Sequence, residues 1–376
     1  MRKRTNATAG AVTPTSASRR RFLQGSTLAA LGTTAATLLP AASSSAADST
    51  IPANCPAPPA APMKDVAGRV AFITGGDSGI GLGVARAFAD AGMKVVITYR
   101  TKAHLDEAMK LLEGAGDRVH AVNVDVTDRP ALAAAADEAV KKFGKVHVLV
   151  ANAGVAIIGG IGTATYDDWD WGMGINSTGV FNSIRTFLPR IKAQGEGGHI
   201  IATSSLAGLL AHPVAGVYTA SKYAVVGMME ALRGELANTN IGVTVFCPGL
   251  VNTNIGTSNR NRPTTLADSG FKIDPAMMAR MPQQMRQMQG PPPGMDPLEA
   301  GQRVLHAMQN NDLYVLTTPE YEGEFAARAE AINASLPTDV VAPPMRINIQ
   351  KMLVGASVYT PERDRKRCER ARAKKA

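Results

Sequence analysis

The sequence predicts an α/β protein built on one doubly wound parallel sheet of about seven strands. Seven short apolar runs, rich in β-branched residues, recur between residues 69 and 317. Segments with helical periodicity separate most of these runs, and the first run leads directly into a glycine-rich turn. Buried parallel strands consist of nearly continuous apolar residues, and regular alternation with helices places helices on both faces of the sheet.

Each predicted strand is a run in which Val, Ile or another apolar residue predominates. The runs are RVAFIT (69–74), KVVITY (94–99), VHAVNV (119–124), VHVLVA (146–151), HIIATS (199–204), VTVFC (243–247) and LYVLT (313–317). The segments between them, such as GVARAFADAG and RPALAAAADEAVKKFG, place apolar residues at helical spacing. We therefore expect one folded domain over residues 63–335, without internal repeats.

The two ends of the chain differ in composition from this domain. Residues 1–47 contain six basic residues and no acidic one, and an apolar stretch and small residues follow the second basic cluster. This order predicts an export signal. Residues 48–62 form a linker rich in Pro and Ala, and residues 336–376 form a C-terminal extension that ends in a basic tail.

The positive charge of the protein lies at its ends. The formal net charge is +9; residues 1–47 contribute +6 and residues 362–376 contribute 8 − 3 = +5, which leaves 9 − 6 − 5 = −2 for the rest. The composition therefore argues against nucleic acid as a partner. We expect the basic tail to be a solvated, frayed end, with contact to phosphates or anionic lipid as the alternative.

The cysteines and histidines show no spacing typical of a metal site. Cys247 lies in an apolar run and is expected to be buried, whereas Cys55 and Cys368 lie in segments that we expect to be mobile. A disulfide between these two is possible after export. No metal is assigned to any histidine, namely His104, His120, His147, His199, His212 and His306.

The glycine-rich turn after the first strand predicts a phosphate-binding loop. Residues 74–81 read TGGDSGIG, and a predicted helix follows. Glycines let the backbone turn sharply and approach a pyrophosphate, which the first N–H groups of the helix can bind. For this loop alone, a tight strand–turn–helix connection without a ligand is the alternative.

A tyrosine and a lysine lie four residues apart in the segment YTASK, at Tyr218 and Lys222. On a helix this spacing places the phenol beside the ammonium group. A neighbouring cation favours the phenolate, so the tyrosine is expected to exchange protons as a general acid and base. Ser205 follows an apolar strand, at the sheet edge where α/β proteins bind ligands.

These motifs, together with DV after the third strand, NAG after the fourth and PG after the sixth, resemble the classical short-chain dehydrogenase/reductase family over about residues 64–320. The resemblance implies a Rossmann-type fold with catalytic Ser205, Tyr218 and Lys222, and with Asn176 holding the lysine through water. The usual NNAG reads ANAG here, beginning at Ala151. The resemblance also implies these cofactor-binding residues: Gly75, Asp77, Ser78, Gly79, Ile80, Gly81, Tyr99, Arg100, Asp125, Val126, Asn152, Ala153, Gly154, Tyr218, Lys222, Pro248, Gly249, Val251 and Thr253.

The implied activity is that of an NAD(P)(H)-dependent oxidoreductase that interconverts a ketone or aldehyde and an alcohol by hydride transfer. The family also implies a homo-oligomer. Six methionines at residues 277–295, inside a lid expected at 254–297, suggest a bulky apolar substrate; a stripe facing the core or another subunit is the alternative. The alternative functions are a nucleotide-binding sensor or scaffold without turnover, and a non-redox epimerase or dehydratase.

The end of the second strand indicates which cofactor is preferred. A carboxylate there binds the ribose 2′-OH of NAD, whereas a basic residue accommodates the 2′-phosphate of NADP. The sequence has Tyr99 followed by Arg100, whose guanidinium can bind a phosphate with two hydrogen bonds. Asp77 would repel a phosphate close to it, unless it caps the following helix instead. We therefore favour NADP(H) over NAD(H).

The segment SRRRFLQ (18–24) resembles the twin-arginine export motif. That route moves proteins that are already folded with their cofactor. The resemblance implies that residues 1–47 are removed, that the membrane is contacted only during export, and that the mature protein is periplasmic or extracellular in a bacterium. The alternatives are an uncleaved extension on a cytoplasmic enzyme and an organelle transit peptide.

Overall fold

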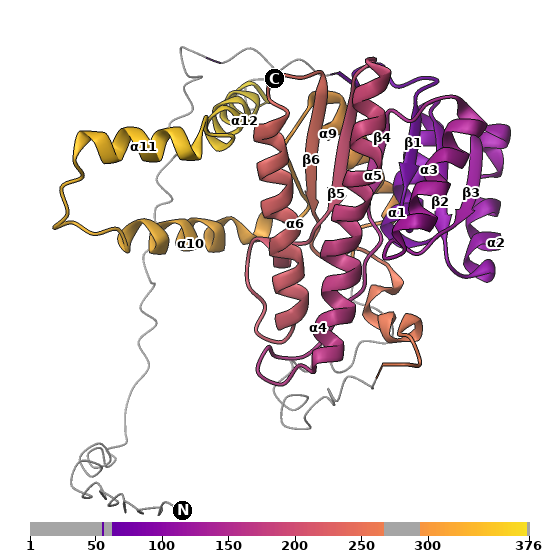
Figure 1. The fold of residues 1–376 in the computed structure, drawn as a ribbon, viewed down its shortest axis with the longest axis horizontal. Helices are drawn as coiled ribbons and strands as arrows, with labels where there is room; N and C mark the ends of the chain where they lie inside the picture. The colour runs from indigo at the N-terminus through magenta and orange to yellow at the C-terminus, as the bar shows by residue number, and fades with distance from the viewer. Residues whose placement is uncertain (1–54, 56–61, 267–293, 374–376) are drawn as a thin grey trace, which may run out of the picture. The chain divides into compact units, whose positions relative to one another are not determined.

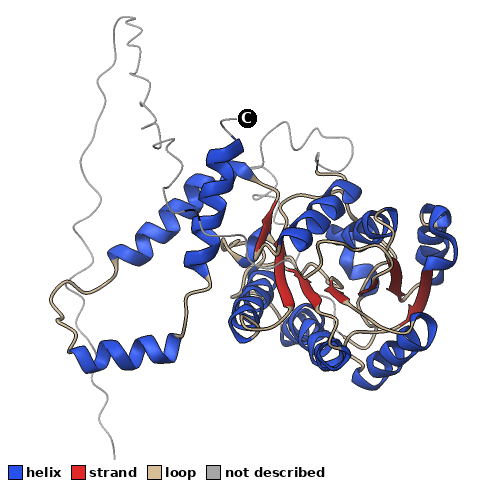
Figure 2. Ribbon diagram, turned by 90° about the horizontal axis from the view of Figure 1, so that it is seen from above, coloured by secondary structure: helices blue, strands red, loops and turns tan. Residues whose placement is uncertain are grey.

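One seven-stranded parallel sheet organises the protein in the computed structural model, which describes Cys55 and residues 62–266 and 294–373 (Figure 1). The strand order is β3-β2-β1-β4-β5-β6-β7, and neighbouring strands pair in parallel. Helices lie on both faces of the sheet (Figure 2). The predicted fold class is confirmed.

The strands lie at the predicted runs, with ends that differ by at most two residues. They are β1 (Val70–Ile73), β2 (Lys94–Tyr99), β3 (Val119–Asn123), β4 (Val148–Ala151), β5 (Gly198–Thr203), β6 (Ile241–Cys247) and β7 (Tyr314–Leu316). Every residue of β1, β4, β5 and β6 is buried, which explains why these runs are continuously apolar.

The helices after the strands supply the two outer layers. They are α1 (Gly79–Asp90), α2 (Lys102–Leu111), α3 (Arg129–Phe143), α4 (Tyr166–Met173), α5 (Gly179–Gln194), α6 (Gly216–Glu235) and α9 (Pro297–Asn310). One apolar cluster lies between the sheet and α3, α5 and α6, and the other lies between the sheet and α1, α2 and α9. Helices α1 and α9 approach closely because Gly83 faces the main chain of Pro297, where a Cβ atom would overlap.

The C-terminal extension is helical, and the prediction of a frayed tail is wrong. It contains α11 (Pro344–Val354) and α12 (Tyr359–Ala373), and α10 (Glu322–Ala334) precedes it at the end of the predicted domain. The guanidinium of Arg365 in α12 is buried between Asp312 and Glu362, at N–O distances of 2.7 and 2.8 Å. Glu362 also accepts a hydrogen bond from the main-chain N–H of Leu313, at 3.1 Å. Among the described helices, none is both long and apolar enough to cross a bilayer.

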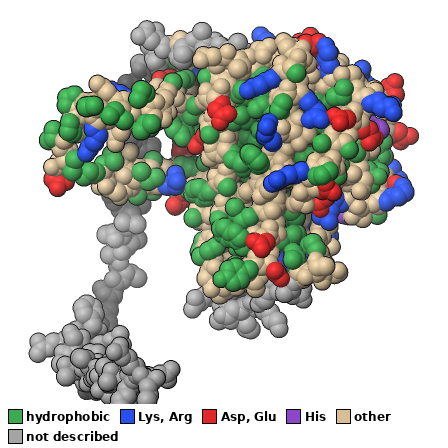
Figure 3. All heavy atoms as spheres, viewed as in Figure 1, with side chains coloured by type: hydrophobic (Ala, Val, Ile, Leu, Met, Phe, Trp, Pro, Cys, Tyr) green, Lys and Arg blue, Asp and Glu red, His purple; other side chains and the backbone are tan. Residues whose placement is uncertain are grey.

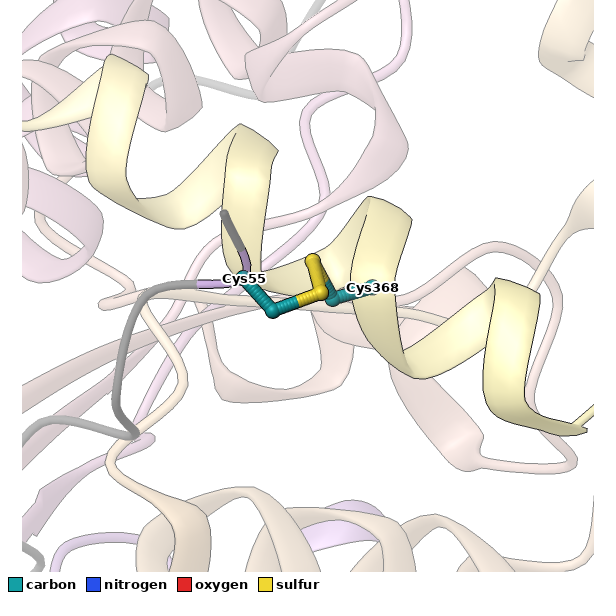
Figure 4. The surroundings of a disulfide bond; sticks show 2 residues. All are labelled: Cys55 and Cys368. Atoms are coloured by element: carbon teal, nitrogen blue, oxygen red, sulfur yellow. A yellow bond between two sulfur atoms is a disulfide. The ribbon is translucent and has the colours of Figure 1, made fainter. Parts of the chain in front are cut away.

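A disulfide joins Cys55 to Cys368 in α12 (Figure 4). The two residues are 313 positions apart in the sequence, and their Cα atoms are 5.9 Å apart. The two segments that we expected to be mobile are therefore linked covalently, which reduces the conformational freedom of the unfolded chain. Cys247 is a buried free thiol in β6, as predicted.

His199 is a fully buried titratable group in the interior strand β5. Its Nε2 atom lies 2.7 Å from the hydroxyl of Thr244, and its Nδ1 atom has no hydrogen-bond partner among the described residues. Burial and, to a smaller extent, the charge of Arg233 lower the pKa of this imidazole to about 3.

We predict that this histidine makes the fold less stable in mild acid. Below about pH 6.5 the unfolded chain binds a proton at His199, whereas the folded chain does not until about pH 3. The free energy of unfolding should fall by about 2 kcal/mol between pH 7 and pH 5 from this group. Denaturant unfolding at several pH values measures the effect. His199→Gln should flatten the dependence; an unchanged slope in this variant would contradict the assignment.

Candidate active site

The carboxyl ends of the central strands open into one cavity, and most of the predicted site residues line it. The lining comes from the loops that follow β1 to β6 and from the first turns of α6. The predicted residues in it are Gly75, Asp77, Ser78, Gly79, Ile80, Tyr99, Arg100, Asp125, Val126, Asn152, Ala153, Gly154, Ser205, Tyr218, Lys222, Pro248, Gly249, Val251 and Thr253. Gly81 and Asn176 are not part of the lining.

The glycine loop presents the uncapped start of α1 to this cavity. Gly75 and Gly79 have φ values of +61° and +52°, which glycine adopts without strain. Ser78 occupies the N-cap position without a side-chain hydrogen bond, and the first turn contains no acidic residue. Asp77 is therefore not the cap of the helix. The free N–H groups and the helix dipole suit a pyrophosphate, so the loop fits a dinucleotide.

Gly81 serves the packing of this loop. A Cβ atom there would overlap the main-chain oxygen of Gly75 and lie 2.5 Å from the amide nitrogen of Asn152. The third glycine of the motif therefore lets α1 lie directly against the loop.

Asn152 connects the glycine loop to two further strands. Its side-chain amide donates hydrogen bonds to the carbonyl oxygens of Thr74 and Gly75, at 3.1 and 3.2 Å. Its side-chain oxygen accepts a hydrogen bond from the Thr203 hydroxyl, at 3.0 Å. On the other side of the loop, the hydroxyl of Thr98 accepts a hydrogen bond from the N–H of Gly75, at 2.9 Å.

Thr98 and Thr203 belong to none of the motifs recognised in the sequence. Both are buried at the ends of strands whose other residues are mainly apolar. A hydroxyl at such a position needs a hydrogen-bond partner, and this is the sequence signal that could have identified them.

Ser205, Tyr218 and Lys222 lie together on one wall of the cavity. Ser205 follows β5, and its hydroxyl forms a hydrogen bond with the Tyr218 phenol that favours the phenolate. Lys222 lies one turn further along α6, with its Nζ atom 5.6 Å from the centre of the Tyr218 ring. The ammonium group is buried and donates a hydrogen bond to the carbonyl oxygen of Thr203, at 3.0 Å.

Burial sets the protonation of this pair. It raises the pKa of the Tyr218 phenol, which the hydrogen bond with Ser205 opposes, and it lowers the pKa of the Lys222 ammonium to about 8. Our expectation that the lysine lowers the tyrosine pKa does not describe this geometry, because burial dominates and the ammonium is directed to Thr203. The phenol is therefore protonated at neutral pH.

Asn176 lies behind the cavity wall rather than in it. It is fully buried, accepts a hydrogen bond from the N–H of Val155 at 2.8 Å, and donates to the hydroxyl of Ser221 at 3.0 Å. Ser221 in turn donates to the carbonyl oxygen of Tyr218, at 2.7 Å. Through these contacts Asn176 links the loop after β4 to the helix that carries Tyr218 and Lys222.

Charged side chains gather at the opposite end of the cavity, after β2 and β3. Arg100 pairs with Asp125 at 3.5 Å, and half of the Arg100 side chain is exposed. Asp77 lies 3.9 Å from His104, and burial raises its pKa. His104 and Arg260 also line this region. Sequence patterns did not identify these two, since they reach the cavity from α2 and from the segment after β6.

The predicted lid at 254–297 is described only in part. Residues 254–261 form a short 3-10 helix, and the hydroxyl of Ser258 there accepts a hydrogen bond from the N–H of Ala156, at 2.9 Å. Met295 pairs with Val251 in an isolated bridge. The methionines from Met277 to Met288 lie outside the described residues. Within the described part of the chain, His, Cys, Asp and Glu form no cluster suited to a metal ion.

The chain is similar in sequence to known dehydrogenases. The model of the short chain dehydrogenase family matches residues 69–264. The C alpha-dehydrogenase of Sphingobium sp. SYK-6 is 37% identical over 282 residues, which are 75% of this chain and 89% of that protein.

Solved structures show the same likeness. A short chain dehydrogenase/reductase from Burkholderia phymatum in complex with NAD is 34% identical, with a TM-score of 0.65 over 74% of this chain and 99% of that chain. A putative short-chain dehydrogenase from Novosphingobium aromaticivorans is 32% identical, with a TM-score of 0.65 over 81% of this chain and 100% of that chain. The protein belongs to the short-chain dehydrogenase family. It is an NAD(P)-dependent oxidoreductase that acts on a small molecule.

Proposed function

We propose that the protein interconverts a carbonyl compound and the corresponding alcohol, with Tyr218 as proton donor and acceptor and NADP(H) as the preferred cofactor. The observation that carries this proposal is the position of Ser205, Tyr218 and Lys222 in the cavity that the glycine loop also lines. The proposed substrate is bulky and apolar. This part rests on the methionines of the lid segment and on the apolar side chains of Val155 and Ile175 in the cavity.

The cofactor, when bound, supplies or accepts the hydride. The carbonyl oxygen of the substrate binds between the Ser205 hydroxyl and the Tyr218 phenol. In reduction, the phenol gives its proton to this oxygen, and the serine hydroxyl stabilises the negative charge that develops there. The raised pKa of Tyr218 keeps this proton available at neutral pH. Lys222, protonated below about pH 8, holds the nicotinamide ribose.

The presence of both Tyr218 and Lys222 in the cavity favours an enzyme rather than a sensor or scaffold. A protein that only binds nucleotide needs no proton donor beside the ligand. An epimerase or dehydratase would need a further acidic group for its proton transfers. The acidic side chains of the cavity lining, Asp77 and Asp125, lie against His104 and Arg100 rather than against Tyr218, which favours the redox reaction.

Replacement of Tyr218 by Phe tests the proposed proton transfer. Tyr218→Phe should leave NADPH binding nearly intact and lower kcat for an accepted ketone by about 10²- to 10⁴-fold, the usual contribution of general acid catalysis. The control is Tyr223→Phe, because Tyr223 lies on the same helix and its hydroxyl donates to the carbonyl oxygen of Leu209 instead. Stopped-flow or steady-state assays measure both variants. Unchanged turnover in Tyr218→Phe would refute the assignment.

Arg100 supports the proposed preference for NADP(H). Its guanidinium is at the end of the cavity where a carboxylate would bind the ribose of NAD, and its half-exposed side chain is accessible to a phosphate. The Burkholderia phymatum relative was solved with NAD, so the preference of this chain needs its own test.

Removal of the guanidinium should discriminate between the two cofactors. Arg100→Ala should weaken NADPH binding by about 10- to 100-fold, since hydrogen bonds to charged groups contribute roughly 1.5–3 kcal/mol, and should leave NADH binding nearly unchanged. The matched control is Lys102→Ala, an exposed cation outside the cavity lining that pairs with Asp106. Fluorescence titration with each cofactor gives the affinities. Equal losses for both cofactors would make Arg100 a structural residue.

We also propose that the protein is exported through the twin-arginine route and matures near residue 47. The sequence SRRRFLQ supports this, and so does the disulfide, because disulfides persist mainly in oxidising compartments. Cleavage near residue 47 would leave Cys55 in the mature chain.

Paired lysine substitutions test the export signal. Wild-type protein should be found outside the cytoplasm with a new N-terminus near residue 48, whereas Arg19→Lys/Arg20→Lys should accumulate uncleaved in the cytoplasm. Cell fractionation, N-terminal sequencing and non-reducing mass spectrometry follow the location, the cleavage and the disulfide. A full-length cytoplasmic product from both genes would rule out export.

A further inference from the structure

Residues 322–354, which we call the arm, lie away from the sheet in both ribbon views (Figures 1 and 2). The arm consists of α10, α11 and the segment between them. Both of its ends are attached to the folded domain. Before α10, the hydroxyl of Thr317 accepts a hydrogen bond from the N–H of Gly249, at 2.9 Å. After α11, the chain enters α12, which the disulfide and the ion pairs of Arg365 hold in place.

The arm exposes much more apolar surface than its size would suggest. No residue of α10 or α11 is buried. Ten large apolar side chains of the arm are exposed, with exposed fractions from 37% to 92%: Ile332, Leu336, Val340, Val341, Met345, Ile347, Ile349, Met352, Leu353 and Val354. Monomeric proteins seldom expose contiguous apolar patches larger than a few hundred Å², so this surface indicates a binding partner.

The helices themselves also need such a partner. They contain 13 and 11 residues, and helices shorter than about 12–15 residues are marginal in water unless tertiary packing supports them. The guanidinium of Arg328 lies over the ring of Tyr223, 5.7 Å from its centre. This contact with the folded domain supports only the first turns of α10.

The charge of the arm argues for a protein surface rather than a membrane. Residues 322–354 contain four acidic and three basic residues, so the formal net charge of the arm is 3 − 4 = −1. Helices that lie on anionic membranes are rich in Lys and Arg on their polar face, and the electrostatic attraction they use is missing here.

The same chain carries a second exposed apolar surface that can receive the arm. The loop after β4 and the loop before α6 lie together, because the N–H of Gly159 donates to the carbonyl oxygen of Val214 at 2.8 Å. Exposed apolar side chains on these loops and on α4 form this surface: Ile158, Ile161, Tyr166, Trp169 and Val214. Figure 3 shows hydrophobic side chains both on the arm and on the part of the domain that carries α4. In a two-fold dimer, each copy would cover the exposed surface of the other.

The area is sufficient for a stable complex. A Val, Leu, Ile or Met side chain carries roughly 60–120 Å² of apolar area. Ten such side chains from each of two arms, mostly exposed, supply on the order of 1,000 Å², before the surfaces they contact are counted. Specific interfaces bury roughly 1,200–2,000 Å² in total. We infer that the arm packs on a second copy of this chain and forms a homo-oligomeric interface.

Sedimentation of the full chain between 1 and 100 μM, in wild-type and variant form, tests this interface. The wild-type protein should sediment as a dimer or larger assembly. Leu353→Glu should raise the dissociation constant of the arm interface by about 100-fold or more, because each copy loses a buried leucine and buries a charge. Leu111→Glu is the matched control, since Leu111 is exposed on α2 away from the arm. It should sediment like the wild type. Retained NADPH binding by Leu353→Glu shows that the variant is folded.

Hydrogen exchange gives a second measurement that needs no substitution. Amides of residues 322–354 should become more protected as the wild-type concentration rises over the same range. A wild-type monomer at 100 μM, or an assembly of unchanged mass in Leu353→Glu, would overturn the inference. Cosedimentation of monomeric protein with phosphatidylcholine/phosphatidylglycerol vesicles would assign the arm to a membrane instead.

Discussion

The hydrogen bonds of Asn152 hold the carboxyl edge of the sheet together, and the cavity depends on them. This one side chain contacts the main chain of Thr74 and Gly75, directly after β1, on one side and the Thr203 hydroxyl at the end of β5 on the other. The carbonyl oxygen of Thr203 in turn accepts the hydrogen bond of the Lys222 ammonium. The dinucleotide loop and the proposed catalytic lysine are therefore positioned from the same three strands, although they lie about 150 residues apart in the sequence. Among the described residues, each of these side chains has at least one hydrogen-bond partner, which offsets the cost of removing it from water.

Burial has opposite effects on the two titratable groups of this wall. It disfavours the phenolate of Tyr218 and the ammonium form of Lys222, so the phenol keeps its proton while the lysine pKa falls to about 8. The free protein is thus prepared to donate a proton. At the other end of the cavity the charges are more exposed, and Arg100 is partly neutralised by Asp125. A phosphate that binds Arg100 therefore competes with the Asp125 carboxylate. Because this ion pair is partly exposed to solvent, breaking it costs less free energy than breaking a buried pair.

The C-terminal extension is attached by charge and by a covalent bond rather than by an apolar face. Helix α12 is strongly polar, and its contacts with the domain include the buried ion pairs of Arg365 and the hydrogen bond between Tyr359 and Glu230. Buried ion pairs are costly to desolvate and by themselves contribute little stability. The disulfide between Cys55 and Cys368 constrains α12 whether or not these ion pairs are stabilising. The arm before α12 is thereby held at both ends, which leaves its apolar side chains available to a second copy.

The fold class, the positions of the seven strands and most of the cavity lining could be predicted, because they follow from periodicity and from short motifs read along the chain. The contacts of each side chain could not be predicted in this way, because they depend on residues that are distant in the sequence. The tail of residues 362–376 has a net charge of +5, yet Glu362 and Arg365 in it are buried, since Asp312 and Leu313 supply partners from elsewhere in the fold. The pKa of Tyr218 likewise shifts in the direction opposite to the one expected from its spacing to Lys222, because desolvation depends on all the atoms packed around a group and not on its neighbours in the sequence.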